Sequence, residues 1–226
     1  RGVEDVLEEA GYTALIVNTD SDPARERTLV ESLRSRQVEG LVVATALVHH
    51  PLLEELQRDG VPMVMVNRRA EGVDAPYVGP DDAAGIELAV RHLAQLGHRR
   101  IAHLAGPSNT STGITRARAF GGAVSLLGLE RSPDLVVGCD QWSAPAGAAG
   151  FEQLLDSGQE FTAVVAGNDL IALGCYDVCA ARGIVCPDDV SIIGFNDMPF
   201  LDKLRPPLTT VSVPHTQIGA EAARLL

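Results

Sequence analysis

Two Asn-Asp pairs in this chain each follow a short apolar run. Residues 164–169 read VVAGND and residues 192–197 read IIGFND, so Asn168 and Asn196 each stand at the end of an expected strand. The two runs are separated by about the length of one βαβ unit, which predicts neighbouring parallel strands. An amide donates and accepts hydrogen bonds but carries no charge, so these residues suit the binding of polar groups such as hydroxyls.

The ends of strands matter because open α/β sheets bind ligands beyond the carboxyl ends of their strands. Asn67 ends another apolar run, VPMVMVN, and joins Asn168 and Asn196 as an expected cleft residue. The alternative is that these asparagines, or the aspartates beside them, only cap the helices that follow, a role for which both residue types are favoured. One cap per helix suffices, so capping does not require both members of a pair.

Two arginines and one tryptophan offer further groups for binding. Arg116 and Arg118 lie in TRARAFGG near the start of an expected helix, and a guanidinium presents a planar fork of donors that suits hydroxyls or a carboxylate. Ordinary exposure on a helix face is the alternative for both arginines. Trp142, the only tryptophan, lies in an expected loop. It either packs under that loop or covers the face of a sugar or planar base.

Composition limits the classes of function. The chain has 226 residues, 46% of them hydrophobic, with a formal net charge of −12 and a pI near 4.8. A globular core is therefore expected, and this segment does not suit contact with a nucleic-acid backbone, which calls for clustered basic residues. It contains no apolar run of the length that spans a bilayer, which predicts a soluble protein. The opening residues read as the last turns of a helix, so the natural protein is expected to begin upstream.

No catalytic, cofactor or metal motif is present. The chain lacks the G-x-S-x-G, Walker A, H-E-x-x-H and G-x-G-x-x-G patterns. The prediction is therefore a protein that is not an enzyme and needs no cofactor. The cysteines lack the paired C-x-x-C spacing of a zinc site and are expected to be free thiols in a reduced cytoplasm. They are Cys139, Cys175, Cys179 and Cys186.

Apolar runs alternate with helical patterns along the whole chain, which is typical of α/β proteins with parallel sheets. Expected strands are YTALIVN, GLVVA, VPMVMVN and PYVG in a first series, then RRIAHLAG, LVVG, FTAVVAG, VSIIGF and LTTVSV in a second. Helices are expected over 23–37, 51–59, 81–97, 115–127, 145–157 and 169–182.

Two series without a flexible linker predict two similar doubly wound lobes around a ligand cleft. The amino-terminal lobe is expected to take residues 1–80 and to be completed by 213–226, and the carboxy-terminal lobe takes 81–212. His215 follows the strand that is expected to cross back between the lobes, which places it among the candidate residues.

Several motifs in order resemble the LacI/GalR family of bacterial transcription regulators. They are HLAQLGHRRIAHLAGP, RARAFGG, AGNDLIALG, CPDDVSIIGFND and RPPLTTVSVP. The resemblance covers nearly the whole chain and implies an effector-binding core with a fold similar to type I periplasmic binding proteins. It also implies a cytoplasmic homodimer that holds helix-turn-helix headpieces on operator DNA. The headpiece and the first strand of the amino-terminal lobe are not in this sequence.

By the same resemblance, the ligand contacts fall on six residues: Asn67, Arg118, Trp142, Asn168, Asn196 and His215. Arg116 is expected to face away from the ligand, so its replacement by alanine is expected to leave both binding and fold intact. The predicted effector is a sugar or sugar derivative, with a nucleobase as the second choice. A periplasmic sugar-binding protein of a transporter and an α/β enzyme are the alternative functions.

Overall fold

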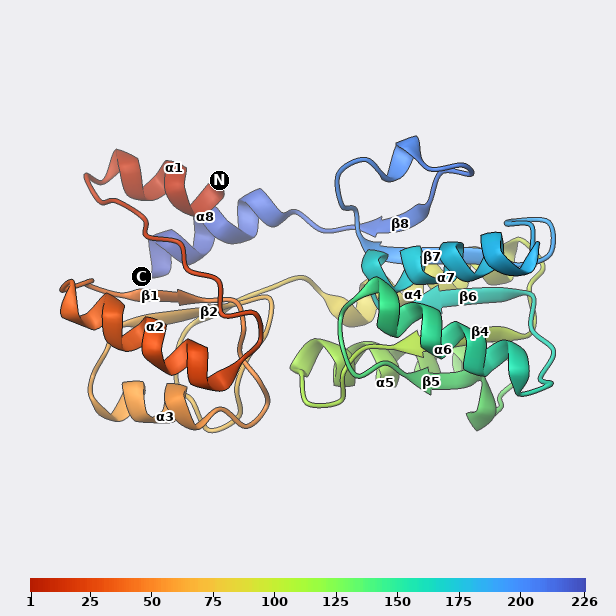
Figure 1. Ribbon diagram of the computed structural model, residues 1–226, viewed down its shortest axis with the longest axis horizontal. Coiled ribbons are helices and arrows are strands. Elements are labelled where there is room, and N and C mark those ends of the chain that lie inside the picture. The colour runs from red at the N-terminus through yellow and green to blue at the C-terminus, as the bar shows by residue number, and fades with distance from the viewer. The chain divides into compact units, whose positions relative to one another are not determined.

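Both parallel sheets expected from the alternating pattern are present in the computed structural model, which describes all 226 residues (Figure 1). The α/β fold class is therefore confirmed. The chain divides into two compact units. Unit 1 takes Arg1–Pro80, Asn109–Ser111 and Pro214–Leu226, and unit 2 takes Asp81–Ser108 and Thr112–Val213.

Unit 1 is built on a small parallel sheet. Its strands, in sheet order, are β1 (Leu41–Val43), β2 (Met63–Val66) and β3 (Tyr77–Val78). Its helices are α1 (Gly2–Glu9), α2 (Pro23–Ser35), α3 (Pro51–Arg58) and α8 (His215–Leu225). Helix α8 packs against β2 and β3, with α1 lying on α8, while α2 and α3 cover the other face of the sheet (Figure 1). The apolar side chains between these layers form the core of the unit.

The stretch YTALIVN does not form the predicted strand. Residues 12–18 carry no strand hydrogen bonds, and Ile16 is 81% exposed. In the sheet of unit 1, β1 pairs only with β2. No strand of the chain therefore forms hydrogen bonds with the backbone of residues 12–18. A run of apolar residues becomes a strand only when another strand lies beside it, and periodicity cannot report that partner.

A buried polar cluster fixes the loop that follows β1. The carboxylate of Glu26 accepts hydrogen bonds from Thr45 Oγ1 at 2.7 Å and from His50 Nε2 at 2.9 Å. His50 Nδ1 accepts from the backbone N–H of Leu47 at 3.1 Å, which places the ring proton on Nε2. Burial raises the pKa of Glu26, but the two hydrogen bonds outweigh it and leave the pKa below its usual value.

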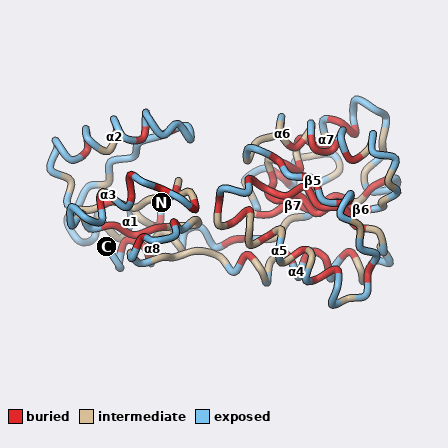
Figure 2. The backbone as a smooth tube through the Cα atoms, turned by 90° about the horizontal axis from the view of Figure 1, so that it is seen from below, coloured by how far each residue is buried: buried red, intermediate tan, exposed pale blue.

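Unit 2 is built on a longer parallel sheet. Its strands, in sheet order, are β5 (Val136–Gly138), β4 (Ile101–Ala105), β6 (Ala163–Ala166), β7 (Ser191–Asn196) and β8 (Thr209–Ser212). Its helices are α4 (Asp82–Gln95), α5 (Ser111–Leu126), α6 (Ala144–Asp156) and α7 (Asp169–Arg182), with short 3-10 turns η1 (Pro133–Leu135) and η2 (Leu201–Lys203). Helices α6 and α7 cover one face of the sheet and α4 and α5 the other (Figure 2).

Most helices in unit 2 begin and end at the capping and helix-ending residues that the sequence predicts. Asp81 caps α4 by accepting from the backbone N–H of Ala84, and Gly183 ends α7 in the left-handed region. Helix α5 begins at Ser111, before the expected start, because burial of Thr112 and Gly113 overrides their low helix propensity. None of the helices combines the length and the apolar character that crossing a bilayer requires.

Strands β6 and β7 are parallel neighbours, as the repeated pattern predicted. Val164 pairs with Ile192 and Val165 pairs with Ile193, so both Asn-Asp pairs emerge at the carboxyl edge of the sheet. Both strands are almost wholly buried, which explains why their sequences are continuous apolar runs rather than alternating ones.

One fully buried histidine makes the stability of unit 2 depend on pH. His103 Nδ1 donates to the carbonyl of Val165 at 2.8 Å, its ring stacks on Phe120, and its Nε2 has no hydrogen-bond partner. Burial lowers the pKa of His103 from 6.5 to about 4. In the unfolded chain, His103 therefore takes up a proton below about pH 6.5, whereas in the folded chain it does so only below about pH 4.

Stability is expected to be full above pH 6.5 and to fall by about 2 kcal/mol between pH 8 and pH 5 through His103 alone. Urea denaturation of the full-length protein across this range measures the loss. His103→Gln is expected to flatten the slope, whereas His49→Gln, at an exposed position, is the matched control and keeps it. An unchanged slope in folded His103→Gln would contradict the assignment.

Candidate ligand-binding site

Three of the predicted ligand contacts stand in unit 2 just beyond the carboxyl ends of strands. Asn168 follows β6, Asn196 is the last residue of β7, and Trp142 lies in the turn between β5 and α6. The carboxyl edge of a parallel sheet is where this class of fold binds ligands. The positions of these residues therefore agree with a binding edge.

Asn168 also caps the following helix. Its side-chain oxygen accepts from the backbone N–H of Ile171 at 2.9 Å, so the capping interpretation is correct for this residue. Capping uses the amide as an acceptor, and a capping asparagine still carries two N–H donors for other partners. The cap therefore fixes the orientation of the amide instead of excluding it from binding.

Asp169 joins the two Asn-Asp turns to each other. Its carboxylate is fully buried and accepts from the backbone N–H of Met198 at 2.9 Å and from Thr210 Oγ1 at 2.5 Å. A side chain at Gly194 would place its Cβ 2.3 Å from Asp169 Oδ1, so β7 passes directly over this carboxylate. Asp169 is therefore a structural residue, and it is not the cap of α7.

The backbone takes left-handed conformations at two of the predicted asparagines. Asn67 has φ 62° and Asn196 has φ 125°, and Asp197 follows with φ 60°. Residues other than glycine rarely adopt positive φ, and such strained positions concentrate at functional sites. Asparagine and aspartate tolerate these conformations best, which gives a local reason for their presence at both strand ends.

Arg116 does not lie on an exposed helix face, which was the alternative expected for it. Its side chain is 3% exposed and pairs with Asp82, the first residue of α4, through a hydrogen bond from Nε at 2.7 Å. Its Nη1 donates to the carbonyl of Gly167 at 2.7 Å. The expectation was wrong because a charged residue on a helix was assumed to face solvent. Here the buried carboxylate of Asp82 pairs with the guanidinium and stabilises its charge inside unit 2.

Arg118 lies on the opposite side of helix α5 from Arg116. Two residues correspond to about 200° of rotation around a helix, so one arginine points into unit 2 while the other is exposed. Exposure leaves the Arg118 guanidinium accessible to a ligand. Of the two arginines, Arg116 is therefore buried inside unit 2, and Arg118 is exposed on the surface of α5.

Trp142 lies across two glycines that follow strands. A side chain at Gly106 would place its Cβ 2.0 Å from the indole Cη2, and one at Gly167 would lie 3.2 Å from Cζ3. Trp142 is half-buried, and the guanidinium of Arg116 lies 5.5 Å from the centre of its ring. Sequence analysis missed these glycines as part of the site, although both are the last residues of expected strands, where glycine permits close approach.

The two remaining predicted contacts belong to unit 1. Asn67 follows β2, its backbone N–H donates to Val78 O at 2.9 Å, and its carbonyl accepts from Tyr77 Oη at 3.3 Å. His215 is exposed and begins α8. As ligand contacts, all six residues stay predictions.

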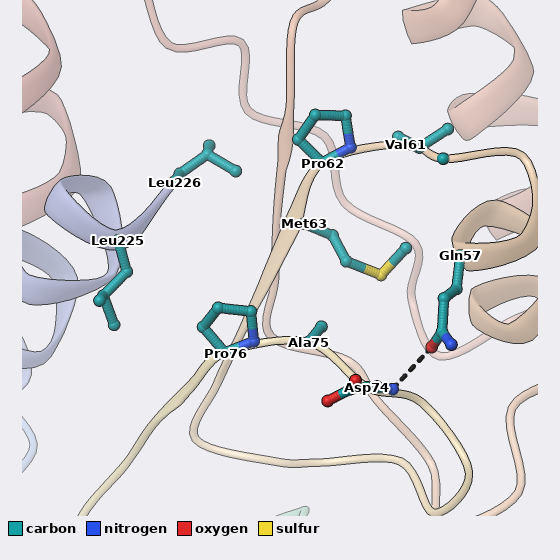
Figure 3. Close-up of a pocket in the computed structure, with 10 residues that line it drawn as sticks. Gln57, Val61, Pro62, Met63, Asp74, Ala75, Pro76, Leu225 and Leu226 are labelled. Atoms are coloured by element: carbon teal, nitrogen blue, oxygen red, sulfur yellow. Dashed lines mark hydrogen bonds between the residues drawn. The ribbon is translucent and has the colours of Figure 1, made fainter.

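The cavity in Figure 3, of about 370 Å³, lies elsewhere in unit 1. It is found at the amino ends of β2 and β3, where Pro62 and Pro76 precede the strands, and the end of α8 forms a further wall. None of the six predicted contacts lines it. It occupies the wrong edge of the parallel sheet for the binding site of this fold class.

Buried thiols in unit 2 belong to its core. Burial raises the pKa of Cys139 and of Cys179 to about 11, and it raises the pKa of Cys175 further. Such thiols stay protonated at neutral pH and are poor nucleophiles and poor metal ligands.

The chain matches known proteins over its full length. The family model described as "Periplasmic binding protein-like domain" matches residues 90–226. An uncharacterized HTH-type transcriptional regulator of Streptomyces limosus is 36% identical over 99% of this chain and 66% of its own length. The HTH-type transcriptional repressor CytR of Escherichia coli is 32% identical over 100% of this chain and 66% of its own.

Solved structures agree with these relatives. The transcriptional regulator CelR in complex with cellobiose matches with a TM-score of 0.91 and 32% identity, over 100% of this chain and 69% of that one. The chain thus spans about two thirds of the length of the curated relatives that it matches.

Proposed function

This chain belongs to the LacI/GalR family of transcription regulators, and we propose that it is the effector-sensing core of one. The transporter alternative is not favoured, because the relatives are transcriptional regulators. In this proposal the core binds a small molecule, and a helix-turn-helix headpiece in the full-length protein contacts operator DNA. The protein works in the cytoplasm as a homodimer, since two half-sites on DNA call for paired headpieces.

The proposed effector is a sugar or sugar derivative. The observation that carries this proposal is the grouping of Trp142 with the two Asn turns at one edge of unit 2. An indole face covers the apolar face of a sugar ring, and amides satisfy its hydroxyls as donors and acceptors. Binding of cellobiose by the structural relative CelR supports the same chemical class.

No reaction is proposed for this edge. Its groups are amides and one indole, together with Asp169 and Arg116, which are buried and held by partners inside unit 2. A general base or nucleophile needs a reactive group within reach of the substrate. The residues that we propose to contact the effector are the six predicted from the sequence: Asn67, Arg118, Trp142, Asn168, Asn196 and His215.

Calorimetric titration of the full-length protein against mono- and disaccharides, including cellobiose, tests the effector class. Nucleosides and purines are titrated in parallel, and every mixture is assayed for turnover. At least one sugar is expected to bind with a dissociation constant in the micromolar range, which corresponds to about −8 kcal/mol. Tight binding of a purine with no response to any sugar would overturn the effector class, and turnover of a sugar would overturn the assignment as a sensor.

A further inference from the structure

One buried pair of side chains connects the turn that carries Asn168 to the turn that carries Asn196. The carboxylate of Asp169, which directly follows Asn168, is fully buried and accepts from Thr210 Oγ1 at 2.5 Å. Thr210 lies on β8, beside Gly194 of β7. The absence of a side chain at Gly194 permits this approach, because a Cβ there would lie 2.3 Å from Asp169 Oδ1. We call Asp169 and Thr210 the Asp-Thr pair.

The Asp-Thr pair binds the two backbone N–H groups that follow Asn196. The N–H of Met198 donates to Oδ2 of Asp169 at 2.9 Å, and the N–H of Asp197 donates to Thr210 Oγ1 at 3.4 Å. The hydroxyl of Thr210 therefore accepts from the turn and donates its own proton to the carboxylate. Both N–H groups of the turn are thus held by side chains of other elements, one from α7 and one from β8.

The turn that is held in this way has a strained backbone. Asn196 has φ 125° and Asp197 has φ 60°, which are two successive positive values at residues other than glycine. Such conformations persist only where the surrounding structure determines them. Relaxation to negative φ would change the direction of the Asn196 side chain. The hydrogen bonds of the Asp-Thr pair oppose this relaxation.

We propose that the Asp-Thr pair positions Asn196 by holding its turn in the strained conformation, and that it thereby sets the affinity for the effector. The proposal rests on the proposed function for the meaning of this edge, but the strained turn exists without ligand. Asp169 and Thr210 act through the backbone of residues 196–198 rather than by touching the effector. When the pair is broken, the turn populates relaxed conformations. The apparent affinity then falls in proportion to the fraction of molecules that keep the strained turn.

The threonine offers a set of matched variants. Thr210→Val replaces the hydroxyl with a methyl group, whereas Thr210→Ser keeps the hydroxyl and is expected to restore the wild-type behaviour. Thr209→Val, at an exposed neighbouring position of β8, is the matched control. Thr210→Ala guards against simple loss of folding, because its smaller side chain leaves room for a water molecule beside the buried carboxylate of Asp169.

Hydrogen–deuterium exchange of the full-length protein, read by mass spectrometry without any ligand, tests the holding of the turn. In Thr210→Val and Thr210→Ala, peptides that contain residues 196–198 are expected to exchange at least about fivefold faster, because their N–H groups lose hydrogen bonds. Peptides from β6 and α6 should exchange as in the wild type, which shows that unit 2 stays folded. Thr210→Ser and Thr209→Val should keep the wild-type exchange throughout.

Calorimetric titration with cellobiose and the other saccharides of the screen tests the effect on binding. Thr210→Val and Thr210→Ala are expected to bind at least about fivefold more weakly, and Thr210→Ser and Thr209→Val as tightly as the wild type. Wild-type exchange of the turn in both folded variants would overturn the proposal, and so would fast exchange with unchanged affinity. Fast exchange in a protein that binds no saccharide would refute the proposed effector class while sustaining the holding of the turn by the Asp-Thr pair.

Discussion

Arg118→Ala is expected to weaken effector binding by roughly 30- to 1000-fold in the full-length protein. The family resemblance predicts that this arginine contacts the ligand, and the structure shows that it is exposed on the side of α5 opposite to the internal Arg116. Removing a charged donor from a ligand oxygen that is buried on binding costs on the order of 2–4 kcal/mol. Calorimetric titration with the sugar found by screening measures the loss.

Arg118→Lys is not expected to restore binding, because an ammonium lacks the planar fork of donors. Arg91→Ala is the matched control, since it removes an exposed arginine from α4. Thermal denaturation of both alanine variants should coincide with that of the wild type. Equal affinity in Arg118→Ala and Arg91→Ala would show that the ligand contacts must be sought elsewhere.

Arg116→Ala is expected to destabilise the protein by about 3–5 kcal/mol, because it leaves the carboxylate of Asp82 buried without its partner. This expectation reverses the one drawn from the sequence, in which the same substitution was neutral. Urea denaturation at pH 7 measures the change in unfolding free energy. Asp82→Asn in the same background is expected to recover about half of the loss or more, since it removes the unpaired charge.

The pH dependence of this destabilisation gives an independent check. Burial already raises the pKa of Asp82, and Arg116 opposes that rise. Without the arginine the pKa rises further above its value in the unfolded chain, so the folded state gains stability as the pH falls and the carboxyl takes up a proton. The difference between Arg116→Ala and the wild type should therefore shrink on acidification from pH 7. A difference that stays constant down to pH 5 would contradict the buried carboxylate as its cause.

The order of elements in unit 2 could be predicted from the sequence because its signals are local. Buried parallel strands are continuous apolar runs, and residues such as Asp81 and Gly183 mark the ends of helices through their own backbone chemistry. The repeat of VVAGND and IIGFND correctly predicted neighbouring strands and the shared edge of Asn168 and Asn196. These inferences need only the periodicity of the chain and the length of one βαβ unit.

Partner-dependent features could not be predicted in this way. YTALIVN has the composition of a strand, but whether it becomes one depends on a neighbour that its own residues do not encode. Arg116 and Arg118 are alike in type and close in sequence, yet one is buried and the other is exposed. The difference depends on Asp82, which lies thirty-four residues earlier in the chain.

The sequence by itself determined the fold class, the family and the sheet edge that Asn168 and Asn196 share, because each depends on residue types at short spacing. Only the tertiary structure decided which polar groups face that edge and which support it from inside. Asn168 proved to be a helix cap, Asp169 a buried acceptor, and Arg116 a buried partner of Asp82. A charged or polar side chain can lie inside when distant segments supply its partners, and such pairings form only when the chain has folded.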